Sequence, residues 1–359
     1  MSSDKRVVIF VPGITGSQLL SASSLHTKIW PNKVVEHKGD QAEALKLVSD
    51  DKLVTGEPID EVIIKKYPVY DILIKYFKDN DYQYTCDEQE LHHSTHDKIL
   101  FGLGYDWRKD NADSAKRLAD LVNNAWGWHQ DAEFTLLAHS MGGLICRYAL
   151  EQNLIQVSLN RLITLGTPHL GAPKALETIV GLENDNEVFH SDTLQTFSNT
   201  PGYPTTFQLL PGQNSFVLDD SSKEWLDVWN DPFKNVLISE MGVKINNFAP
   251  ARAFIDGINN TNPNPKIPYH IIAGTDVKDA DYQTITSFTY TKSQPLTPNT
   301  TTKGDGTVPE WSATFGHCVR KKNMRSKSFG GIKHMELVQD EGVLNYVYQV
   351  IASSDDEAG

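Results

Sequence analysis

One short segment constrains the fold of this chain more than any other. Phe134–Ala138 has the composition of a buried strand, and apolar residues at helical spacing resume at Leu144. The junction Ala138–Gly142 reads Ala-His-Ser-Met-Gly, a strand-to-helix turn that presents a serine hydroxyl above the edge of a sheet, with alanine replacing the usual first glycine. A helix-capping role for Ser140 is the alternative, which the apolar strand before it disfavours. The segment predicts a strand–turn–helix unit carrying a nucleophile.

Strand-like and helix-like segments alternate along the rest of the chain. This alternation is typical of an α/β fold in which a mostly parallel sheet has helices on both faces. The further predicted strands are Val7–Val11, Arg161–Leu165, Tyr269–Ala273 and Lys327–Phe329, and the predicted helices cover 69–77, 111–126 and 342–351.

Two mixed segments, at about 20–65 and 181–268, interrupt the alternation. The second is rich in Asn, Asp and Pro, with a local helical pattern at Lys223–Trp229. A length of 359 residues allows two domains at about 150 residues each. However, strands on both sides of each segment are needed for one site. We therefore predict a single domain over 1–359, with both segments forming a cap that selects the substrate.

A serine hydroxyl is a weak nucleophile until a base takes its proton and a carboxylate orients that base. In this class of sites the chain order is serine, acid, histidine. Asp305 lies in a Gly-Asp-Gly turn, and His334 follows the last predicted strand. We predict that Ser140, Asp305 and His334 act together. Asp276 is the rival acid and His317 the rival base.

The negative charge that develops on an attacked carbonyl must be held by backbone donors. The amide of Met141 follows the serine directly. The loop 12–17, which comes after the first predicted strand, can supply a second amide from Ile14 or Thr15, and the sequence does not choose between these two. A phosphate-binding loop is excluded here because no Gly-Lys-Ser/Thr follows.

Six segments, in this order along the chain, resemble the lecithin:cholesterol acyltransferase family, which includes lysosomal phospholipase A2 and phospholipid:diacylglycerol acyltransferases. The segments are Val11–Ser17, Tyr105–Arg108, Ala138–Gly143, Leu165–Pro173, Gly304–Pro309 and His334. The resemblance implies an α/β-hydrolase fold whose serine is acylated by an ester. It matches Ser140, Asp305 and His334 to the catalytic triad, and Met141 with the 14–15 loop to the oxyanion hole.

The chain also departs from the better-known secreted members of this family. Its three cysteines, Cys86, Cys146 and Cys318, leave the first insertion without a disulfide. Trp30, in that insertion, is expected on the resemblance to contact substrate, and packing of the indole in the interior is the alternative. Membrane contact is therefore left open. The segment Tyr105–Arg108 is expected to brace the loop below the site.

Composition excludes other classes of protein. With 33 basic and 46 acidic residues the net charge is −13, which argues against nucleic-acid binding by a basic surface. His92 and His96 have the spacing of a metal pair but lack a third ligand, so we predict no metal there. The predicted serine chemistry requires neither a metal nor an organic cofactor. Without an apolar leader at the N-terminus, we expect a cytoplasmic protein.

The sequence predicts a serine hydrolase that cleaves carboxylic esters through an acyl-Ser140 intermediate, in the manner of a lipase, phospholipase or esterase. The substrate is a small-molecule or lipid ester. One alternative is an O-acyltransferase that moves a fatty acyl group from a phospholipid to an alcohol. Another is a binding protein that uses the same fold without catalysis. Acyl-chain length, interfacial activation and oligomeric state are left open.

Overall fold

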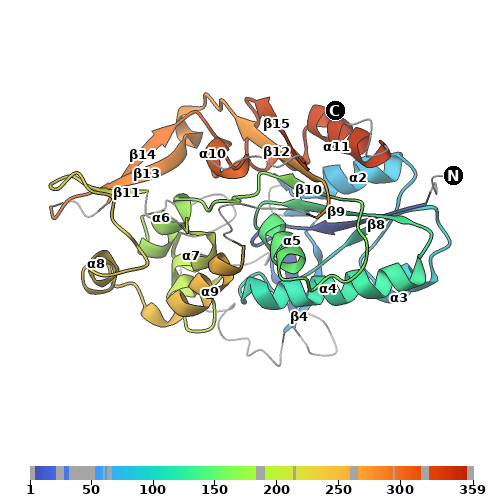
Figure 1. Ribbon diagram of the computed structural model, residues 1–359, viewed down its shortest axis with the longest axis horizontal. Helices are drawn as coiled ribbons and strands as arrows, with labels where there is room; N and C mark the ends of the chain where they lie inside the picture. Colours follow the sequence, from blue (N-terminus) through green and yellow to red (C-terminus); the bar gives the residue numbers. More distant parts are fainter. Residues whose placement is uncertain are drawn as a thin grey trace.

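A computed structural model of the protein describes residues 5–21, 28–31, 53–59, 61–62, 67–182, 191–212, 216–258, 266–293, 296–316 and 323–353. Figure 1 shows a central sheet with helices on both of its faces. Among the described helices, none is both long and apolar enough to cross a membrane.

The central sheet has seven strands in the order β15-β12-β10-β9-β1-β8-β7. Every neighbouring pair in it is parallel, which confirms the predicted parallel α/β fold. The strands are β1 (Arg6–Val11), β7 (Gln83–Thr85), β8 (Lys98–Gly102), β9 (Glu133–His139), β10 (Arg161–Leu165), β12 (Tyr269–Thr275) and β15 (Met324–Gly330).

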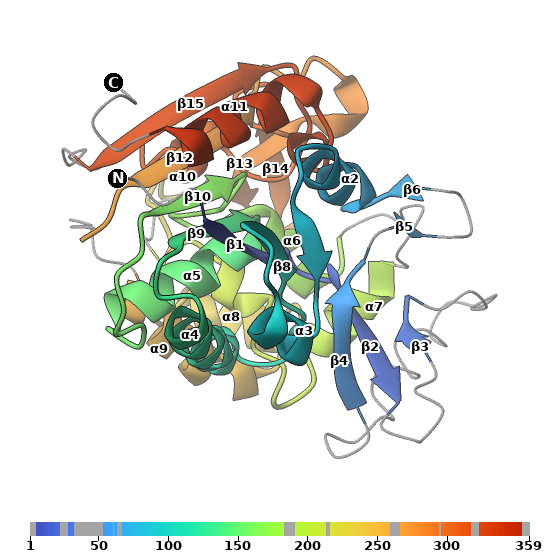
Figure 2. The same ribbon diagram turned by 90° about the vertical axis from the view of Figure 1, so that its right-hand side faces the viewer.

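Strand β1 shows why both faces of the sheet are covered. Its side chains alternate between the two faces, as they do in any strand. Val7 and Ile9 pack with α4 and α5 in one hydrophobic cluster, whereas Val8 and Phe10 pack with α2 and α11 in another. Figures 1 and 2 show these helix pairs on opposite sides of the sheet. The helices are α2 (Asp71–Asp79), α4 (Asn111–Trp128), α5 (Met141–Glu151) and α11 (Glu341–Ala352).

The first insertion forms a small antiparallel sheet beside the main one (Figure 2). Its middle strand, β2, continues directly from the loop after β1 and pairs with both neighbours. Much of 20–65 lies outside the described residues. The described strands of this region are β2 (Ser17–Ser21), β3 (Lys28–Trp30), β4 (Leu53–Pro58), β5 (Glu61–Val62) and β6 (Tyr67–Pro68).

The second insertion has a hydrophobic cluster of its own, which reaches beyond the predicted boundaries. Phe288 of β13 and Leu176 of α6 belong to the same cluster as Phe248 of α9, and β11 pairs with β13. The cap boundaries therefore stay a prediction. The elements are α6 (Lys174–Val180), α7 (Ser191–Ser198), β11 (Val217–Asp219), α8 (Phe233–Ser239), α9 (Phe248–Ile258), β13 (Thr284–Tyr290) and β14 (Thr297–Thr301).

The local helical pattern at Lys223–Trp229 does not form a helix. The segment turns back on β11 instead: Trp225 bridges Leu218 in antiparallel fashion, and the amide of Leu226 donates to the carbonyl of Val217. Lys223 has a φ of 60°, which does not fit a right-handed helix. Pairing with a neighbouring strand overrode the local helical spacing.

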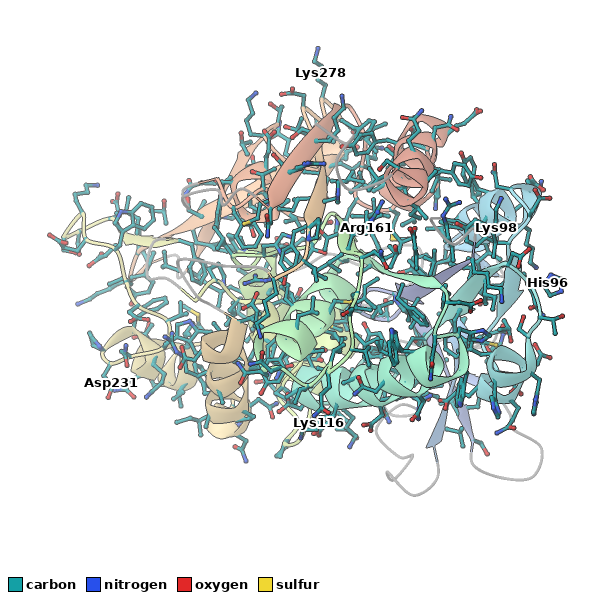
Figure 3. All side chains as sticks on the ribbon, turned by 45° about the vertical axis from the view of Figure 1, so that its right-hand side comes forward. His96, Lys98, Lys116, Arg161, Asp231 and Lys278 are labelled. Atoms are coloured by element: carbon teal, nitrogen blue, oxygen red, sulfur yellow. The ribbon has the colours of Figure 1, made fainter. Side chains whose placement is uncertain are left out.

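Charged side chains are buried where the closing helix meets the sheet. Arg161, at the start of β10, is 2% exposed and donates to the carbonyls of Val350 and Ser353 at the end of α11. In Figure 3 its label lies over the middle of the molecule, whereas the exposed residues His96 and Lys116 are labelled near the edge. His270 of β12 is also buried, and burial, followed by the charges of Arg161 and Arg325, lowers its pKa to about 4.

The buried His270 predicts that stability falls in mild acid. An unfolded histidine has a pKa near 6.5, so below that pH the unfolded chain binds a proton that the folded chain does not bind until about pH 4. The free energy of unfolding should therefore decrease as the pH falls from 6.5 toward 4, by up to about 1.4 kcal/mol per pH unit from this group. Denaturant titrations at several pH values should show a shallower decrease in His270→Gln. The exposed His96→Gln variant should follow the wild type, and parallel curves for all three proteins would contradict this assignment.

Candidate active site

Ser140 occupies a strained turn between β9 and α5. Its φ of 53° and ψ of −127° are unusual for a residue with a side chain. The two glycines that follow permit this turn. A Cβ on Gly142 would lie 2.3 Å from the carbonyl oxygen of Val11, and one on Gly143 would lie 2.0 Å from Oγ1 of Thr167. The predicted strand–turn–helix unit is confirmed. The close approach to β1 explains Gly142, and the close approach to the loop after β10 explains Gly143.

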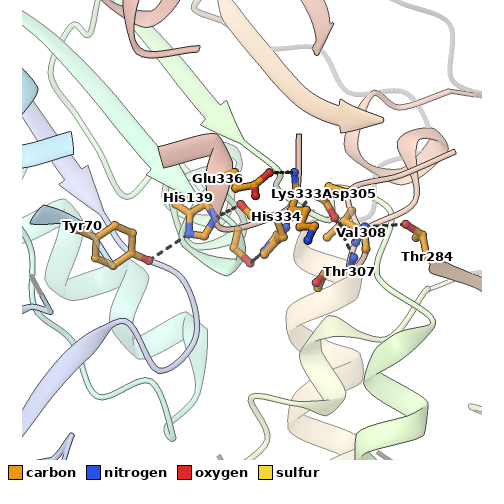
Figure 4. A network of polar contacts seen from close by, with 11 residues as sticks. Tyr70, His139, Thr284, Asp305, Thr307, Val308, Lys333, His334 and Glu336 are labelled. Carbon is orange, nitrogen blue, oxygen red and sulfur yellow. Dashed lines mark hydrogen bonds and ion pairs between the residues drawn. The ribbon is translucent and has the colours of Figure 1, made fainter. Parts of the chain in front are cut away.

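The structure brings together the three side chains that the sequence singled out. His334 Nε2 lies 2.9 Å from Ser140 Oγ, and His334 Nδ1 lies 2.7 Å from Asp305 Oδ2. Figure 4 shows His334 beside Asp305. The Asp305 carboxylate can only accept from the Nδ1–H of neutral His334, so the lone pair of Nε2 faces the serine hydroxyl. The geometry suits removal of a proton from Ser140.

Backbone amides hold the Asp305 carboxylate in place. The side chain is 1% exposed, and a buried carboxylate needs hydrogen-bond donors to stay charged. Its Oδ1 accepts from the amides of Thr307 at 3.0 Å and Val308 at 2.7 Å, which leaves Oδ2 for the histidine. The turn that carries Asp305 also contacts β13, because the amide of Gly306 donates to Oγ1 of Thr284.

Two glycines at the ends of neighbouring strands form the floor beneath this pair. A Cβ on Gly166, after β10, would lie 3.0 Å from both Asp305 Oδ2 and His334 Nδ1. One on Gly274, in β12, would lie 2.8 Å from the Cβ of Asp305. Any larger residue would push the acid and the base away from the sheet. The sequence placed Gly166 in the resembling segment Leu165–Pro173 but did not reveal this contact.

The rival residues have other surroundings. Asp276 pairs with Lys303 at 3.2 Å, and both side chains are exposed. His317 lies outside the described residues. Cys146 is fully buried inside α5, where burial raises the pKa of its thiol, so it is a core residue.

The loop 12–17 passes directly against the serine. A Cβ on Gly13 would lie 3.0 Å from the Cβ of Ser140. Three aromatic side chains donate hydrogen bonds to the carbonyl groups of this loop and so fix the orientation of its peptide planes. They are Tyr105 to Pro12 at 2.8 Å, Trp30 to Thr15 at 2.8 Å and Trp107 to Ser17 at 3.2 Å.

The amides proposed for the oxyanion hole are available. Within the described part of the chain, the amides of Ile14, Thr15 and Met141 have no hydrogen-bond acceptor. Thr15 has a φ of 63°, a second strained residue beside the site. Both loop amides stay candidates for the second donor.

Trp30 and the segment Tyr105–Arg108 support the loop from below. Trp30 is 2% exposed, and its ring packs edge-on against Trp107. The Arg108 guanidinium is fully buried and binds Asp106 in a bidentate pair. These contacts match the expected bracing role. The predicted contact of Trp30 with substrate stays a prediction.

The histidines with metal-pair spacing do not share a helix face. Helix α3 (Glu88–His93) ends before His96, and the rings of His92 and His93 stack on each other. In the described ranges, no group of three or more His, Cys, Asp or Glu side chains is arranged to hold a metal ion.

Sequence reasoning missed two residues of this site, Tyr70 and His139. Tyr70 accepts from the amide of Gly13 and contacts Nδ1 of His139, whose Nε2 contacts the carbonyl oxygen of His334 (Figure 4). The position of His139 beside the serine was the only available signal for it. Tyr70 carries none: it falls at the start of the predicted helix 69–77, and helical spacing does not reveal that its hydroxyl reaches the site. In the structure Tyr70 directly precedes α2.

The parallel sheet and the turn at Ser140 define an α/β-hydrolase. Comparison with protein families matches residues 82–261, half of the chain, to the lecithin:cholesterol acyltransferase family. The chain belongs to this family. It is therefore an enzyme of lipid-ester chemistry, either a hydrolase or an acyltransferase.

Several solved structures are similar to the chain. Lipase BlEst2 of Bacillus licheniformis, in its mature form, is 15% identical with a TM-score of 0.43, covering 97% of this chain and 92% of that one. Phospholipase PlaB of Legionella pneumophila, in complex with thio-NAD, is 13% identical with a TM-score of 0.48, covering 98% and 60%. A comparison with curated proteins gives no match.

Proposed function

We propose that the protein is a serine hydrolase that cleaves carboxylic esters of lipids through an acyl-Ser140 intermediate. The observation that carries this proposal is the unbroken line of contacts from Ser140 through His334 to the buried Asp305. Membership of the acyltransferase family supports lipid esters as the substrate class.

In the first step His334 acts as the general base. Its Nε2 accepts the proton of Ser140 as Oγ attacks the ester carbonyl, and the Asp305 carboxylate stabilises the imidazolium that forms. The strained backbone at Ser140 holds Oγ beside His334 Nε2, so little reorganisation is needed before the attack.

The carbonyl oxygen becomes an oxyanion in the tetrahedral intermediate. The amide of Met141 and the amide of Ile14 or Thr15 donate to it. Because aromatic side chains already hold the loop carbonyls, these donors are oriented before substrate binds. One such donor typically lowers the barrier by about 3 kcal/mol.

The intermediate then collapses with proton transfer from His334 Nε2 to the departing alcohol oxygen. The acyl group stays on Ser140 as an ester. In the second half of the reaction, His334 takes a proton from water, whose oxygen attacks the acyl carbonyl, and then returns that proton to Ser140 Oγ as the acid departs.

The direct test of the nucleophile is labelling with a fluorophosphonate, which forms a covalent bond to an activated serine. The wild type should be labelled at Ser140, and Ser140→Ala should lose both labelling and ester turnover. Ser221→Ala, on an exposed turn, is the matched control and should behave as wild type. Equal labelling of the wild type and Ser140→Ala would overturn the proposed nucleophile. Absence of labelling in a folded wild type would favour the non-catalytic binding protein.

The two candidate acids can be separated by isosteric substitution. Asp305→Asn keeps the shape of the side chain but no longer stabilises the protonated His334, so kcat should fall on the order of 10³- to 10⁴-fold, with KM little changed. Asp276→Asn removes only the surface pair with Lys303 and should leave kcat unchanged. The steady-state rates on a chromogenic ester measure this difference, and the reverse order would identify Asp276 as the acid.

The second candidate is transfer of the acyl group to an alcohol, which the name of the family favours. Both reactions share acyl-Ser140 and differ only in the acceptor that attacks it. With a phospholipid donor we expect free fatty acid as the main product, and addition of a long-chain alcohol should change the product distribution only slightly. Product analysis by chromatography measures this ratio. Predominant formation of the new ester would assign the protein as an acyltransferase.

A further inference from the structure

We propose that Tyr70 and His139 are positioning residues that fix the oxyanion loop (residues 12–17) relative to the base His334. This inference rests on the proposed function, because it concerns the same site. It assigns roles to two side chains that need not touch the substrate and that lie between the loop after β1 and the loop after β15.

The contacts form a continuous path across the site. The amide of Gly13 lies 2.9 Å from Tyr70 Oη, which lies 3.1 Å from His139 Nδ1. His139 Nε2 lies 3.1 Å from the carbonyl oxygen of His334. One end of the path is the residue before the candidate oxyanion donor Ile14. The other end is the backbone of the catalytic base, as Figure 4 shows for its labelled members.

The hydrogen positions along this path follow from the chemistry of its ends. The Gly13 amide can only donate, so Tyr70 Oη accepts from it and gives its own proton to His139 Nδ1. The His334 carbonyl can only accept, so His139 carries its proton on Nε2. Burial keeps both groups neutral: it raises the pKa of Tyr70 and, together with the nearby His334, lowers the pKa of His139 well below its usual range. Every hydrogen bond in the path therefore has one direction.

Packing leaves these two side chains little freedom. Both are 1% exposed. The Tyr70 ring packs edge-on against Phe10 of β1, with 4.9 Å between centroids, and a Cβ on Gly16 would lie 2.8 Å from Tyr70 Oη. His139 is itself the last residue of β9, next to the nucleophile. The path is thus anchored to the neighbouring strands β1 and β9.

Such a link matters because the donors and the base come from separate loops. The oxyanion amide and His334 must reach opposite sides of the same tetrahedral centre, and an error of about 1 Å can cost about 100-fold in rate. The path joins the two loops without using the substrate. It therefore fixes their separation in the free enzyme.

The main test is Tyr70→Phe, which keeps the ring and removes both of its hydrogen bonds. We expect the rate of fluorophosphonate labelling, and kcat on a chromogenic ester, to fall about 10- to 100-fold per folded molecule, with KM within about twofold of wild type. The matched control is Tyr76→Phe in α2, the helix that begins directly after Tyr70. The Tyr76 hydroxyl donates to Asn345, far along the chain. This variant should label at the wild-type rate.

Substitutions of His139 separate the two halves of the path. His139→Gln keeps an N–H for the His334 carbonyl but loses the acceptor for Tyr70, so it should resemble Tyr70→Phe. Because both changes break the same hydrogen bond, the double variant should be no slower than Tyr70→Phe. His139→Asn keeps an acceptor for Tyr70 and loses the donor to His334. It should be slowed as well. If Tyr70→Phe does not fold, the two His139 variants carry the test.

The outcomes distinguish this inference from the proposed function. Labelling of Tyr70→Phe and His139→Gln at the wild-type rate, with only a lower melting temperature by circular dichroism, would overturn the inference and leave Ser140 as the nucleophile. Fully additive losses in the double variant would also overturn it. A wild type that shows no labelling dependent on Ser140 would overturn the proposed function and this inference with it.

Discussion

The parallel pairing of β1 with β9 is the constraint on which the site depends. Their register sets Val11 opposite Ala138, so the loops that follow leave the same edge of the sheet side by side. Ligands of open α/β sheets bind at this edge, where neighbouring connections diverge. Gly142 allows the helix after Ser140 to pass the backbone of Val11 at a distance that no Cβ would tolerate. The nucleophile and the oxyanion loop meet for that reason.

The acid and base are added to this pair of loops from the other half of the chain. Asp305 reaches the sheet only after the excursion through β13 and β14, and Gly274 and Gly166 let it approach the strand ends. The amide of His334 donates to the carbonyl of Asp305, so backbone as well as side chains joins acid and base. The strands of the whole sheet therefore place Asp305 and His334 relative to Ser140. Local turns alone could not bring these three residues together.

Sequence patterns predicted the parts of the molecule whose signals are local. Buried strands, the helix that Asp110 caps, and the turn at Ser140 all follow from composition and spacing. The helical pattern at Lys223–Trp229 did not give a helix, because antiparallel pairing with β11 outweighed the local spacing. Tyr70 could not be found, because its role depends on contacts with Phe10 and His139, which are distant in sequence, and the helical spacing over 69–77 does not reveal them.

Three sequence features were enough to predict the class of the protein: alternating strands and helices, a serine at a strand-to-helix turn, and an acid followed by a histidine later in the chain. Which groups meet became visible only in the folded chain. It paired His334 with Asp305 and Asp276 with Lys303, and it turned Trp30 inward onto the carbonyl of Thr15. The physical reason is that composition and periodicity are read along the chain, whereas hydrogen bonds depend on positions a few ångströms apart that strands far apart in sequence bring together.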